Sequence, residues 1–389
     1  MKTEEAVRRI LVCPNAFKGS MTAAQAAQAI AEGLAHGLAA IPHKIVCLPL
    51  ADGGDGTLET LVSATNGTLH REWVRGPRGQ EVEAAWGRLG GECHDTAIIE
   101  MAAAAGIRLL APDQYDPRVT TTYGVGQLMR AAVRDGCRTL LVGIGGSATN
   151  DGGAGMAQAL GARLLDREGI ELLPGGAALA HLARIDLTDW QLGDDIKVLV
   201  ACDVDNPLCG PAGASAVYGP QKGADSEAVQ ELDAALGHYA DILEAQFQRD
   251  LRAIPGAGAA GGLGAGLMAF CKANVMSGTD MALEITDFER ALAGCDLVVT
   301  GEGRLDGQTT RGKVVAGVIK RAKSRGIPVI ALAGSVEDGT EAALRPEGLQ
   351  AALSIVQSPL PVAEAMRNGY GLLKSCAERL GLLLGLWLP

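Results

Sequence analysis

The chain has few aromatic residues and a deficit of positive charge. Phe, Trp and Tyr make up only 3% of its 389 residues, which argues against nucleic-acid modules that stack bases on aromatic platforms. Asp and Glu number 45 against 34 Lys and Arg, for a net charge of -11. We therefore expect neither a nucleic acid nor an anionic membrane as a partner. A small anionic ligand needs only a local positive pocket and is not excluded.

Cysteine and histidine motifs are also missing. The nine cysteines form no C-x-x-C pair, which predicts free thiols in a reducing compartment. No two of the six histidines have metal-binding spacing. The polar N-terminus lacks the apolar core of a secretory signal, and the most apolar stretch, residues 380–389, is far shorter than the roughly 18 residues of a membrane span. These absences predict a cytoplasmic protein.

Glycine, in contrast, is abundant at 53 residues. Short apolar runs alternate with glycine- and aspartate-rich loops and with helical patterns, which predicts a parallel α/β sheet. The clearest helical pattern covers residues 22–38, in which Thr22 and Gln25 have capping-box spacing. The six apolar runs are residues 10–13, 45–48, 139–142, 198–201, 297–300 and 329–332.

One segment interrupts the parallel pattern. Residues 69–74, 82–89 and 96–101 are separated by GPRG and GGE turns, which predicts an antiparallel meander of three strands. We therefore predict one α/β domain formed from both chain ends, residues 1–70 and 290–389, and a second α/β domain, residues 71–289, inserted between them. The glycine-dense segment 255–266 is interpreted either as a hinge or as a close-packed helix start.

In open α/β sheets, ligands bind outside the carboxyl ends of the strands, and five of the six strand-end loops here carry charged side chains. In the first loop, Lys18 precedes a capped helix, which is either an anion site or a plain cap beside a solvated lysine. In the second loop, Asp52 and Asp55 are suited to Mg²⁺, to a hydroxyl group or to capping the helix that begins near Thr57.

The third loop, residues 143–153, contains a weak motif. Gly143, Gly145 and Ala148 formally fit a G-x-G-x-x-A dinucleotide fingerprint, but no clear ribose-binding acid follows about twenty residues later. The hydroxyl and amide groups of this loop suit phosphate contacts better, with a tight turn as the alternative. In the fourth loop, Asp203 is suited to accept a proton from an attacking hydroxyl, to hold a metal or to cap a turn.

The fifth loop resembles a phosphate-binding loop without matching it. Gly307 to Lys313 spells G-x-x-x-x-G-K, but Val314 stands where a Walker A loop has Ser or Thr. A P-loop NTPase is therefore not expected. The loop still favours an anion contact by Lys313 and a Mg²⁺ site at Glu302 and Asp306, with an ordinary turn before a helix as the alternative.

Taken together, these motifs resemble the bacterial-type glycerate kinases, which phosphorylate the 2-hydroxyl. The resemblance covers almost the whole chain, although the tail after residue 357 carries no motif. It rests on eight blocks in the family's order: PNAFKGS, DGGDGT, TTYGVG, GGSATNDGG, CDVDNPLCGP, YGPQKGA, PGAGAAGGLG and GEGRLDGQT.

The resemblance implies ATP-dependent phosphorylation of D-glycerate to 2-phosphoglycerate and ADP, with Mg²⁺ as the metal. It also implies a Rossmann-like domain from both chain ends, an inserted α/β domain and an active site in the cleft between the two. Because the chain has few aromatic residues, we expect the adenine to lie among aliphatic side chains.

Phosphoryl transfer needs cations and amides for the phosphates and a carboxylate to orient the hydroxyl, and we assign roles on that basis. The predicted catalytic residues are Lys18 and Asp203. The predicted substrate-binding residues are Asn15, Ser20, Asp52, Asp55 and Thr57. The predicted nucleotide contacts are Gly145, Gly146, Ser147, Thr149, Asn150, Asp151 and Lys313. The predicted metal ligands are Glu302 and Asp306.

Two other functions are compatible with the residues. One is an NAD-dependent hydroxy-acid dehydrogenase using residues 143–148, and the other is a non-catalytic sugar-acid sensor. The acidic loops suit a metal–nucleotide site and count against both. The sequence leaves open which hydroxyl reacts, which loop holds the nucleotide and whether other hydroxy acids are accepted. It also leaves open a homo-oligomer, in which the apolar tail with Leu386 and Trp387 would cover a partner.

Overall fold

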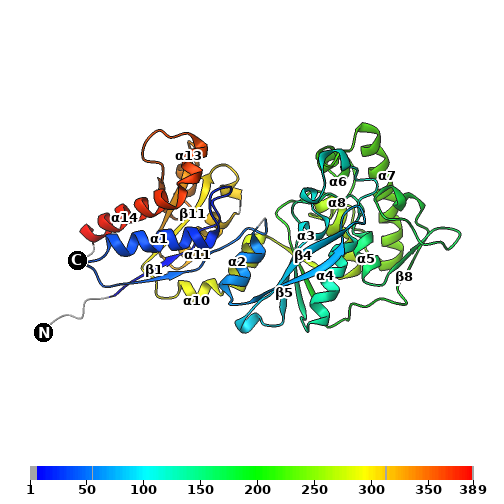
Figure 1. The fold of residues 1–389 in the computed structure, drawn as a ribbon, viewed down its shortest axis with the longest axis horizontal. Coiled ribbons are helices and arrows are strands. Elements are labelled where there is room, and N and C mark those ends of the chain that lie inside the picture. Colours follow the sequence, from blue (N-terminus) through cyan, green and yellow to red (C-terminus); the bar gives the residue numbers. More distant parts are fainter. Residues whose placement is uncertain (1–6, 55, 312, 388–389) are drawn as a thin grey trace. The chain divides into compact units, whose positions relative to one another are not determined.

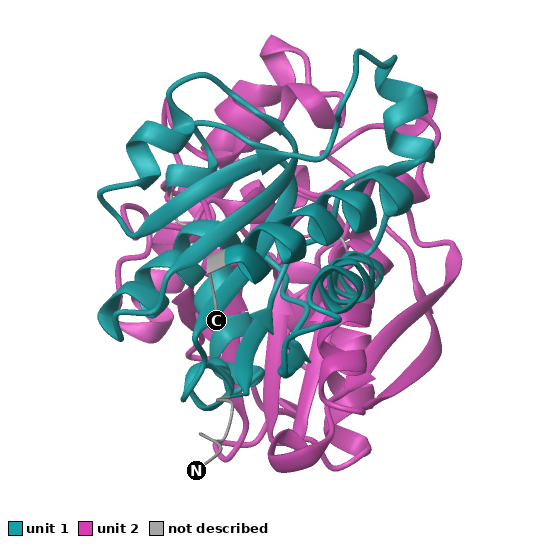
Figure 2. Ribbon diagram, turned by 90° about the vertical axis from the view of Figure 1, so that its left-hand side faces the viewer, with its two compact units in different colours: residues 1–52, 279–389 teal, residues 53–278 magenta. Residues whose placement is uncertain are grey.

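The computed structural model describes residues 7–54, 56–311 and 313–387, and the chain divides into two compact units (Figure 2). Unit 1 comprises residues 1–52 and 279–389, and unit 2 comprises residues 53–278. The predicted α/β class, with one part built from both chain ends, is confirmed. The sequence-based boundaries stand at residues 70 and 290, whereas the units divide at 52 and 278. The cleft between domains stays a prediction.

Unit 1 is built on five parallel strands in the order β13-β12-β11-β1-β2 (Figure 1). Counted along the chain within this unit, the order is 2-1-3-4-5, a doubly wound arrangement whose switch point lies between β1 and β11. Ligands bind at such a switch point because the loops leave β1 and β11 in opposite directions. The strands are β1 (Arg8–Val12), β2 (His43–Cys47), β11 (Leu297–Leu305), β12 (Val329–Val336) and β13 (Leu349–Ser354).

Helices cover both faces of this sheet. Alternate residues of β1 pack on α1 and α14 on one face and on α9 to α12 on the other. Helices α1 and α14 lie side by side (Figure 1), and a Cβ on Gly33 or Gly37 would collide with the α14 backbone. The predicted capping box of Thr22 and Gln25 begins α1. The helices are α1 (Ala23–Gly37), α9 (Gly278–Ile285), α10 (Phe288–Leu292), η6 (Thr309–Arg311), α11 (Val314–Ser324), α12 (Thr340–Leu344), α13 (Val362–Arg367) and α14 (Gly369–Trp387).

Unit 2 is built on six strands in the order β10-β9-β6-β5-β4-β3. The antiparallel meander predicted from the GPRG and GGE turns is confirmed as β3, β4 and β5, and β5, β6, β9 and β10 are parallel. The strands are β3 (Thr68–Arg75), β4 (Glu81–Arg88), β5 (Thr96–Glu100), β6 (Thr139–Gly143), β9 (Lys197–Ala201) and β10 (Asn274–Met276), and a small separate sheet holds β7 (Arg163–Leu165) and β8 (Arg184–Asp186).

The glycine-dense segment lies within the core of unit 2. Gly261 and Gly262 have positive φ (69° and 86°), and a Cβ on Gly261 would collide with the Thr149 carbonyl. The segment is therefore a close-packed helix start, and the hinge interpretation is wrong because the chain passes between the units at residues 52 and 278. The helices of unit 2 are α2 (Thr57–Ala64), η1 (Gly91–Cys93), α3 (Ala102–Ala105), η2 (Ile107–Leu109), η3 (Pro112–Gln114), α4 (Tyr123–Arg134), α5 (Ala154–Ala159), η4 (Ala177–His181), α6 (Ala214–Tyr218), η5 (Pro220–Lys222), α7 (Ser226–Phe247) and α8 (Ala259–Phe270).

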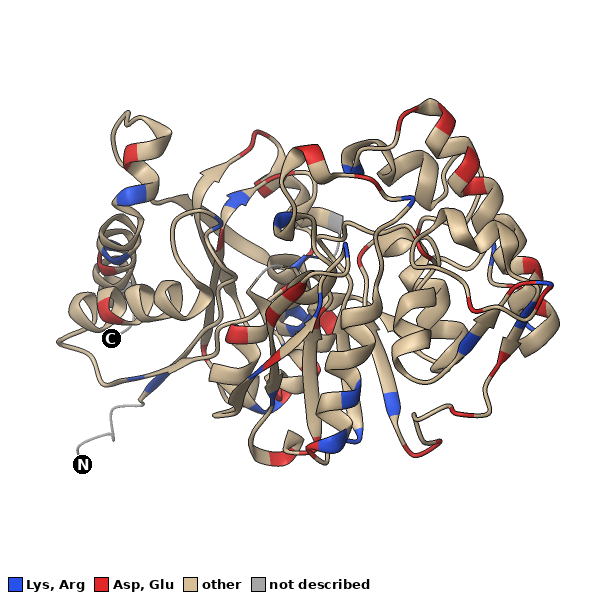
Figure 3. Ribbon diagram, turned by 45° about the vertical axis from the view of Figure 1, so that its right-hand side comes forward, with Lys and Arg blue, Asp and Glu red and all other residues tan. Residues whose placement is uncertain are grey.

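Acidic and basic positions are interspersed along both units (Figure 3). The nine cysteines are free thiols, as predicted. Within the described ranges, none of the helices combines the length and the hydropathy needed to cross a membrane.

Candidate functional site

The loops after β1 and β2 bring three polar side chains together at the switch point of unit 1. The backbone N–H of Asn15 donates to the Gly301 carbonyl at 2.8 Å, which fixes the first loop to β11. The Asn15 amide nitrogen lies 3.4 Å from Oδ2 of Asp52, and Nζ of Lys18 lies 3.7 Å from the same oxygen. The Asp52 side chain is 11% exposed and that of Lys18 is 68% exposed. A nearly buried carboxylate therefore holds a lysine that is open to a ligand.

Glu302 lies in β11 rather than in the loop that the sequence predicts. The strand continues to Leu305, because residues 301, 302, 304 and 305 pair with β12. Glu302 is only 7% exposed, and the Thr309 hydroxyl donates to its Oε1 at 2.7 Å. The pKa of Glu302 is raised above its ordinary value, mainly by burial, and the charges of Asp52 and Asp306 add to that rise. The hydrogen bond from Thr309 and the charge of Lys313 act in the opposite direction.

The segment after β11 carries a carboxylate and a lysine. Oδ1 of Asp306 accepts from the Gln308 N–H at 2.8 Å, and Oδ2 lies 3.8 Å from Nε of Arg304. Nζ of Lys313 donates to Oε1 of Gln308 at 2.8 Å. Lys313 is the cap residue of α11, which begins at Val314, so its predicted position at a helix start is confirmed.

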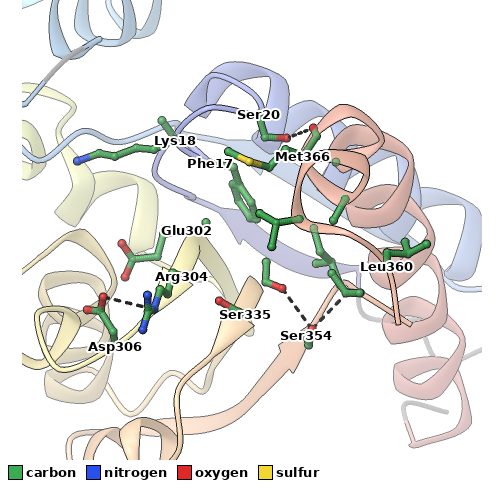
Figure 4. A pocket seen from close by; sticks show the side chains of 18 of the residues that line it. Phe17, Lys18, Ser20, Glu302, Arg304, Asp306, Ser335, Ser354, Leu360 and Met366 are labelled. Carbon is green, nitrogen blue, oxygen red and sulfur yellow. Dashed lines mark hydrogen bonds and ion pairs between the residues drawn. The ribbon is translucent and has the colours of Figure 1, made fainter. Parts of the chain in front are cut away.

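The switch point thus gathers six predicted site residues from four segments of the chain. A cavity of about 940 Å³ opens at this edge of the sheet, and side chains after β13 and from α13 form its far wall (Figure 4). Sequence reasoning missed this wall because no motif marks residues after 357. The Ser20 hydroxyl donates to the Met366 carbonyl at 2.6 Å and so joins the first loop to α13. The six residues are Asn15, Lys18, Asp52, Glu302, Asp306 and Lys313.

The oxygen donors of this cluster suit a hard cation. Glu302 and Asp306 supply carboxylates, and the charge of Asp52 also acts on Glu302. In the described part of the chain, no group of three or more His, Cys, Asp or Glu side chains has the geometry of a metal site. Mg²⁺ is usually held by one or two carboxylates together with water and phosphate oxygens. Two carboxylates at the switch point therefore fit Mg²⁺, and the assignment of Glu302 and Asp306 stays a prediction.

The glycine loop of unit 2 is only partly open. Gly145 and Gly146 are exposed and Ser147 is 9% exposed. Thr149 and Asn150 are fully buried, and the Asn150 amide donates to the Ser215 hydroxyl at 2.9 Å. The part of this loop that is open to a ligand is therefore shorter than the predicted phosphate cradle.

Asp151 is fully buried among backbone donors. Its carboxylate accepts from the N–H groups of Thr122 at 2.7 Å, of Gly153 at 3.2 Å and of Gly155 at 3.2 Å. The pKa of Asp151 is raised above its ordinary value because burial outweighs the opposing effect of the hydrogen bonds from Thr122, Gly153 and Gly155. These contacts tie together the starts of α4 and α5, which is a positioning role. The predicted nucleotide contacts of Thr149, Asn150 and Asp151 stay predictions.

Lys222 lies behind the glycine loop. It is 2% exposed, and its Nζ donates to the Thr149 carbonyl at 2.7 Å. Burial lowers the pKa of Lys222 to about 7, and the charge of Asp151 opposes that shift. The YGPQKGA block is the sequence signal for this residue, but burial among such distant partners has no signature in the sequence.

Asp203 follows β9 and is exposed, and its carboxylate accepts from the Gly278 N–H at 3.0 Å. A Cβ on Gly53 would lie 3.0 Å from the Gly278 Cα and 3.2 Å from the Ala201 Cβ. The two connections to unit 1 therefore leave unit 2 together, beside the end of β9.

Thr57 and Asp55 belong to the second loop. The Thr57 hydroxyl donates to the Gly54 carbonyl at 2.6 Å, and Thr57 is buried. Asp55 lies outside the described residues. The start of α2 is capped by Glu100 at the end of β5, whose Oε1 accepts from the Leu58 N–H at 3.0 Å. Leu58 and Glu100 lie 42 positions apart in the sequence, so no local motif marks this cap.

The chain is similar to known proteins along nearly its whole length. The family model described as "Glycerate kinase family" matches residues 10–385. A protein of Halalkalibacterium halodurans named glycerate kinase is 46% identical over 96% of this chain and 97% of its own length. A protein of Escherichia coli K12 named glycerate 2-kinase is 44% identical over 93% of this chain and 94% of its own.

The fold is shared with a crystal structure from Salmonella typhimurium LT2. That structure matches with a TM-score of 0.89 and 41% identity, and the match covers 98% of this chain and 99% of the other. Sequence and fold thus agree along nearly the whole length, and the chain belongs to the glycerate kinase family.

Proposed function

We propose that this protein is an ATP-dependent kinase that transfers the γ-phosphoryl group of ATP to the 2-hydroxyl of D-glycerate. The observation that carries the proposal is the family match over residues 10–385. The cluster of carboxylates and lysines at the switch point of unit 1 lies within these residues and supports it. The position of transfer rests on the Escherichia coli relative, which is named a 2-kinase.

The reaction exchanges one oxygen–phosphorus bond for another. The oxygen of the 2-hydroxyl forms a bond to the γ-phosphorus, the bond from that phosphorus to the β,γ-bridging oxygen breaks, and ADP leaves. The hydroxyl proton passes to a carboxylate, and Asp203 is our candidate because it is exposed at a strand end and anchored by the Gly278 N–H. A positioned base of this kind contributes about 10²- to 10⁴-fold to the rate.

The lysines of the switch point have an electrostatic role. Charge spreads over the phosphoryl oxygens in the transition state, so fixed cations lower the barrier. Lys18 lies in the first loop and forms an ion pair with the Asp52 carboxylate, and Lys313 lies at the start of α11. Lys18 also suits the carboxylate of glycerate, while Asn15, Asp52, Thr57 and Ser20 remain the proposed substrate contacts.

Glu302 and Asp306 would hold Mg²⁺, which neutralises phosphate charge when it is bound. The Thr309 hydroxyl keeps Glu302 oriented by its 2.7 Å hydrogen bond. The exposed backbone of Gly145 and Gly146 in unit 2 is available for phosphate oxygens, with Ser147 beside it.

The test is turnover of the purified chain with ATP, Mg²⁺ and D-glycerate, followed by ADP release and by coupling to enolase, which accepts 2-phosphoglycerate but not the 3-isomer. We expect glycerate-dependent ADP and an enolase-competent product. ADP without that product would move the reaction to the 3-hydroxyl. No glycerate-dependent ADP would contradict the proposal and lead to other hydroxy acids, then to the dehydrogenase and sensor functions.

A further inference from the structure

The cavity of unit 1 is larger than a small hydroxy acid requires. Its volume is about 940 Å³, and it extends from the switch point along the carboxyl ends of β11, β12 and β13 to α13. Clefts of roughly 300–1,000 Å³ hold ligands of drug or cofactor size. D-Glycerate is a small acid whose surface is almost wholly polar, so it accounts for only one end of this space.

The two ends of the cavity differ in chemistry (Figure 4). Lys18, Glu302, Arg304 and Asp306 lie at one end, and Phe17, Leu360 and Met366 line the other. Val362 also lines the cavity and belongs to the same short helix, α13, as Met366. Val362 is 75% exposed and Met366 is 37% exposed, so both leave apolar surface in contact with water. A ligand with an ionic part and a flat apolar part matches this division.

The apolar wall is fixed to the rest of the unit. The Ser20 hydroxyl donates to the Met366 carbonyl at 2.6 Å. Gly19 has a φ of 78°, and a Cβ there would collide with Cε of Met366. A Cβ on Gly369 would collide with the Ser20 hydroxyl. Glycine at these two positions leaves room for the Met366 side chain and the Ser20 hydroxyl, so the end of α13 and the start of α14 pack against the first loop.

Polar groups also line the cavity, and Ser335 and Ser354 lie between its two ends (Figure 4). The Ser354 hydroxyl lies 3.4 Å from the Gly334 carbonyl and 3.3 Å from the Val356 N–H. The Gln357 amide donates to the Ser375 hydroxyl at 3.1 Å. Ser335 and Ser358 also line the cavity. Such hydroxyl and amide groups are suited to the edges of a base and to ribose hydroxyls.

We infer that this cavity binds the adenosine part of the nucleotide, with the phosphates directed toward Lys18 and Lys313. The inference rests on the proposed function, because of the two reactants only ATP has an aromatic group that would cover Leu360, Val362 and Met366. It makes unit 1 the nucleoside-binding unit, whereas the sequence-based prediction placed nucleotide contacts mainly on residues 145–151 of unit 2. The burial of Thr149, Asn150 and Asp151 in unit 2 favours this assignment.

The test is the binding of ADP, measured by calorimetry without glycerate, to the wild type and to two variants. Val362→Asp places a carboxylate on the apolar wall at an exposed position, so the fold is expected to tolerate it. Leu382→Asp is the matched control, on α14 of the same unit and 56% exposed. We expect Val362→Asp to weaken ADP binding about tenfold and to raise KM for ATP, with KM for D-glycerate nearly unchanged and Leu382→Asp like the wild type.

Wild-type ADP affinity in Val362→Asp would overturn the inference. Gly145→Asp introduces the same charge in the unit 2 loop, where a Cβ meets open space. Weaker ADP binding in both variants would agree with phosphates at that loop and the nucleoside in unit 1, whereas a loss in Gly145→Asp alone would overturn the inference. Turnover of D-glycerate with an unchanged KM for ATP in Val362→Asp would sink the inference and leave the proposed function standing. If Val362→Asp weakens ADP binding but the wild type does not turn over D-glycerate, the inference stands and the proposed function is contradicted.

Discussion

The ammonium of Lys18 lies 3.7 Å from the carboxylate of Asp52, the last residue of unit 1 before the chain enters unit 2. Because Asp52 is nearly buried and Lys18 is mostly exposed, the pair orients a cation rather than stabilising the fold. Substitution of Lys18 measures how much this positive charge contributes to the reaction rate.

Replacing Lys18 by Gln removes that cation and should lower kcat/KM for phosphorylation by about 10²- to 10³-fold, because the charge acts on the transferred phosphoryl group. Lys18→Arg keeps the charge and should retain part of the activity. Lys272→Gln is the matched control, since Lys272 is a surface lysine of unit 2 that is paired with Asp194. Steady-state ADP release measures all three, and full activity of Lys18→Gln would remove Lys18 from the mechanism.

Asp203→Asn should lower kcat by about 10²- to 10⁴-fold and change the KM values much less, because the base acts in the transition state. Asp205→Asn is the control from the same exposed loop. Turnover is compared at saturating ATP and D-glycerate. If Asp203→Asn turns over like the wild type, the base must be sought at Asp306 or Asp52, because Asp151 is fully buried.

Glu302→Gln keeps the shape and the Thr309 contact of the side chain but removes one of two proposed Mg²⁺ ligands. The Mg²⁺ concentration for half-maximal activity should therefore rise about tenfold or more. Glu337→Gln removes a carboxylate beside Arg304 and should not change that concentration. An Mg²⁺ titration of activity separates the two, and an unchanged requirement in Glu302→Gln would exclude Glu302 as a ligand.

Lys222 predicts a pH dependence of stability. Its folded pKa is about 7 against an ordinary 10.5, so between these values the unfolded chain binds more protons than the folded chain. The free energy of unfolding should then rise with pH over this window, by at most about 1.4 kcal/mol per unit. Lys222→Met should remove this rise. Urea denaturation of both proteins from pH 7 to 10 measures the difference, and parallel curves would contradict it.

Gly261→Ala should destabilise unit 2 by more than about 2 kcal/mol, because the new Cβ would meet the Thr149 carbonyl and the backbone has a positive φ. Gly237→Ala is the control within α7, where a Cβ meets open space. That change should stabilise the protein by about 0.5–1 kcal/mol. Thermal and urea unfolding compare them, and equal stability of the two variants would contradict the close packing.

Sequence patterns were sufficient for the class and order of the elements. The alternation of apolar runs with helical patterns, the GPRG and GGE turns and the Thr22–Gln25 capping box are local, and each depends on residues only a few positions apart. For the same reason the motifs PNAFKGS, DGGDGT and GEGRLDGQT already marked the loops that meet at the switch point of unit 1.

Tertiary structure alone decided which charged residues are buried and which are open. Glu302 lies in a strand because β12 pairs with residues for which the sequence pattern predicts a loop. Lys222 donates to a carbonyl 73 residues away, and Asp151 is enclosed by donors from α4 and α5. The wall from α13 has no motif, because it needs only apolar side chains and two glycines that allow close approach. Burial and cavity shape arise from contacts between distant segments, so local pattern cannot encode them.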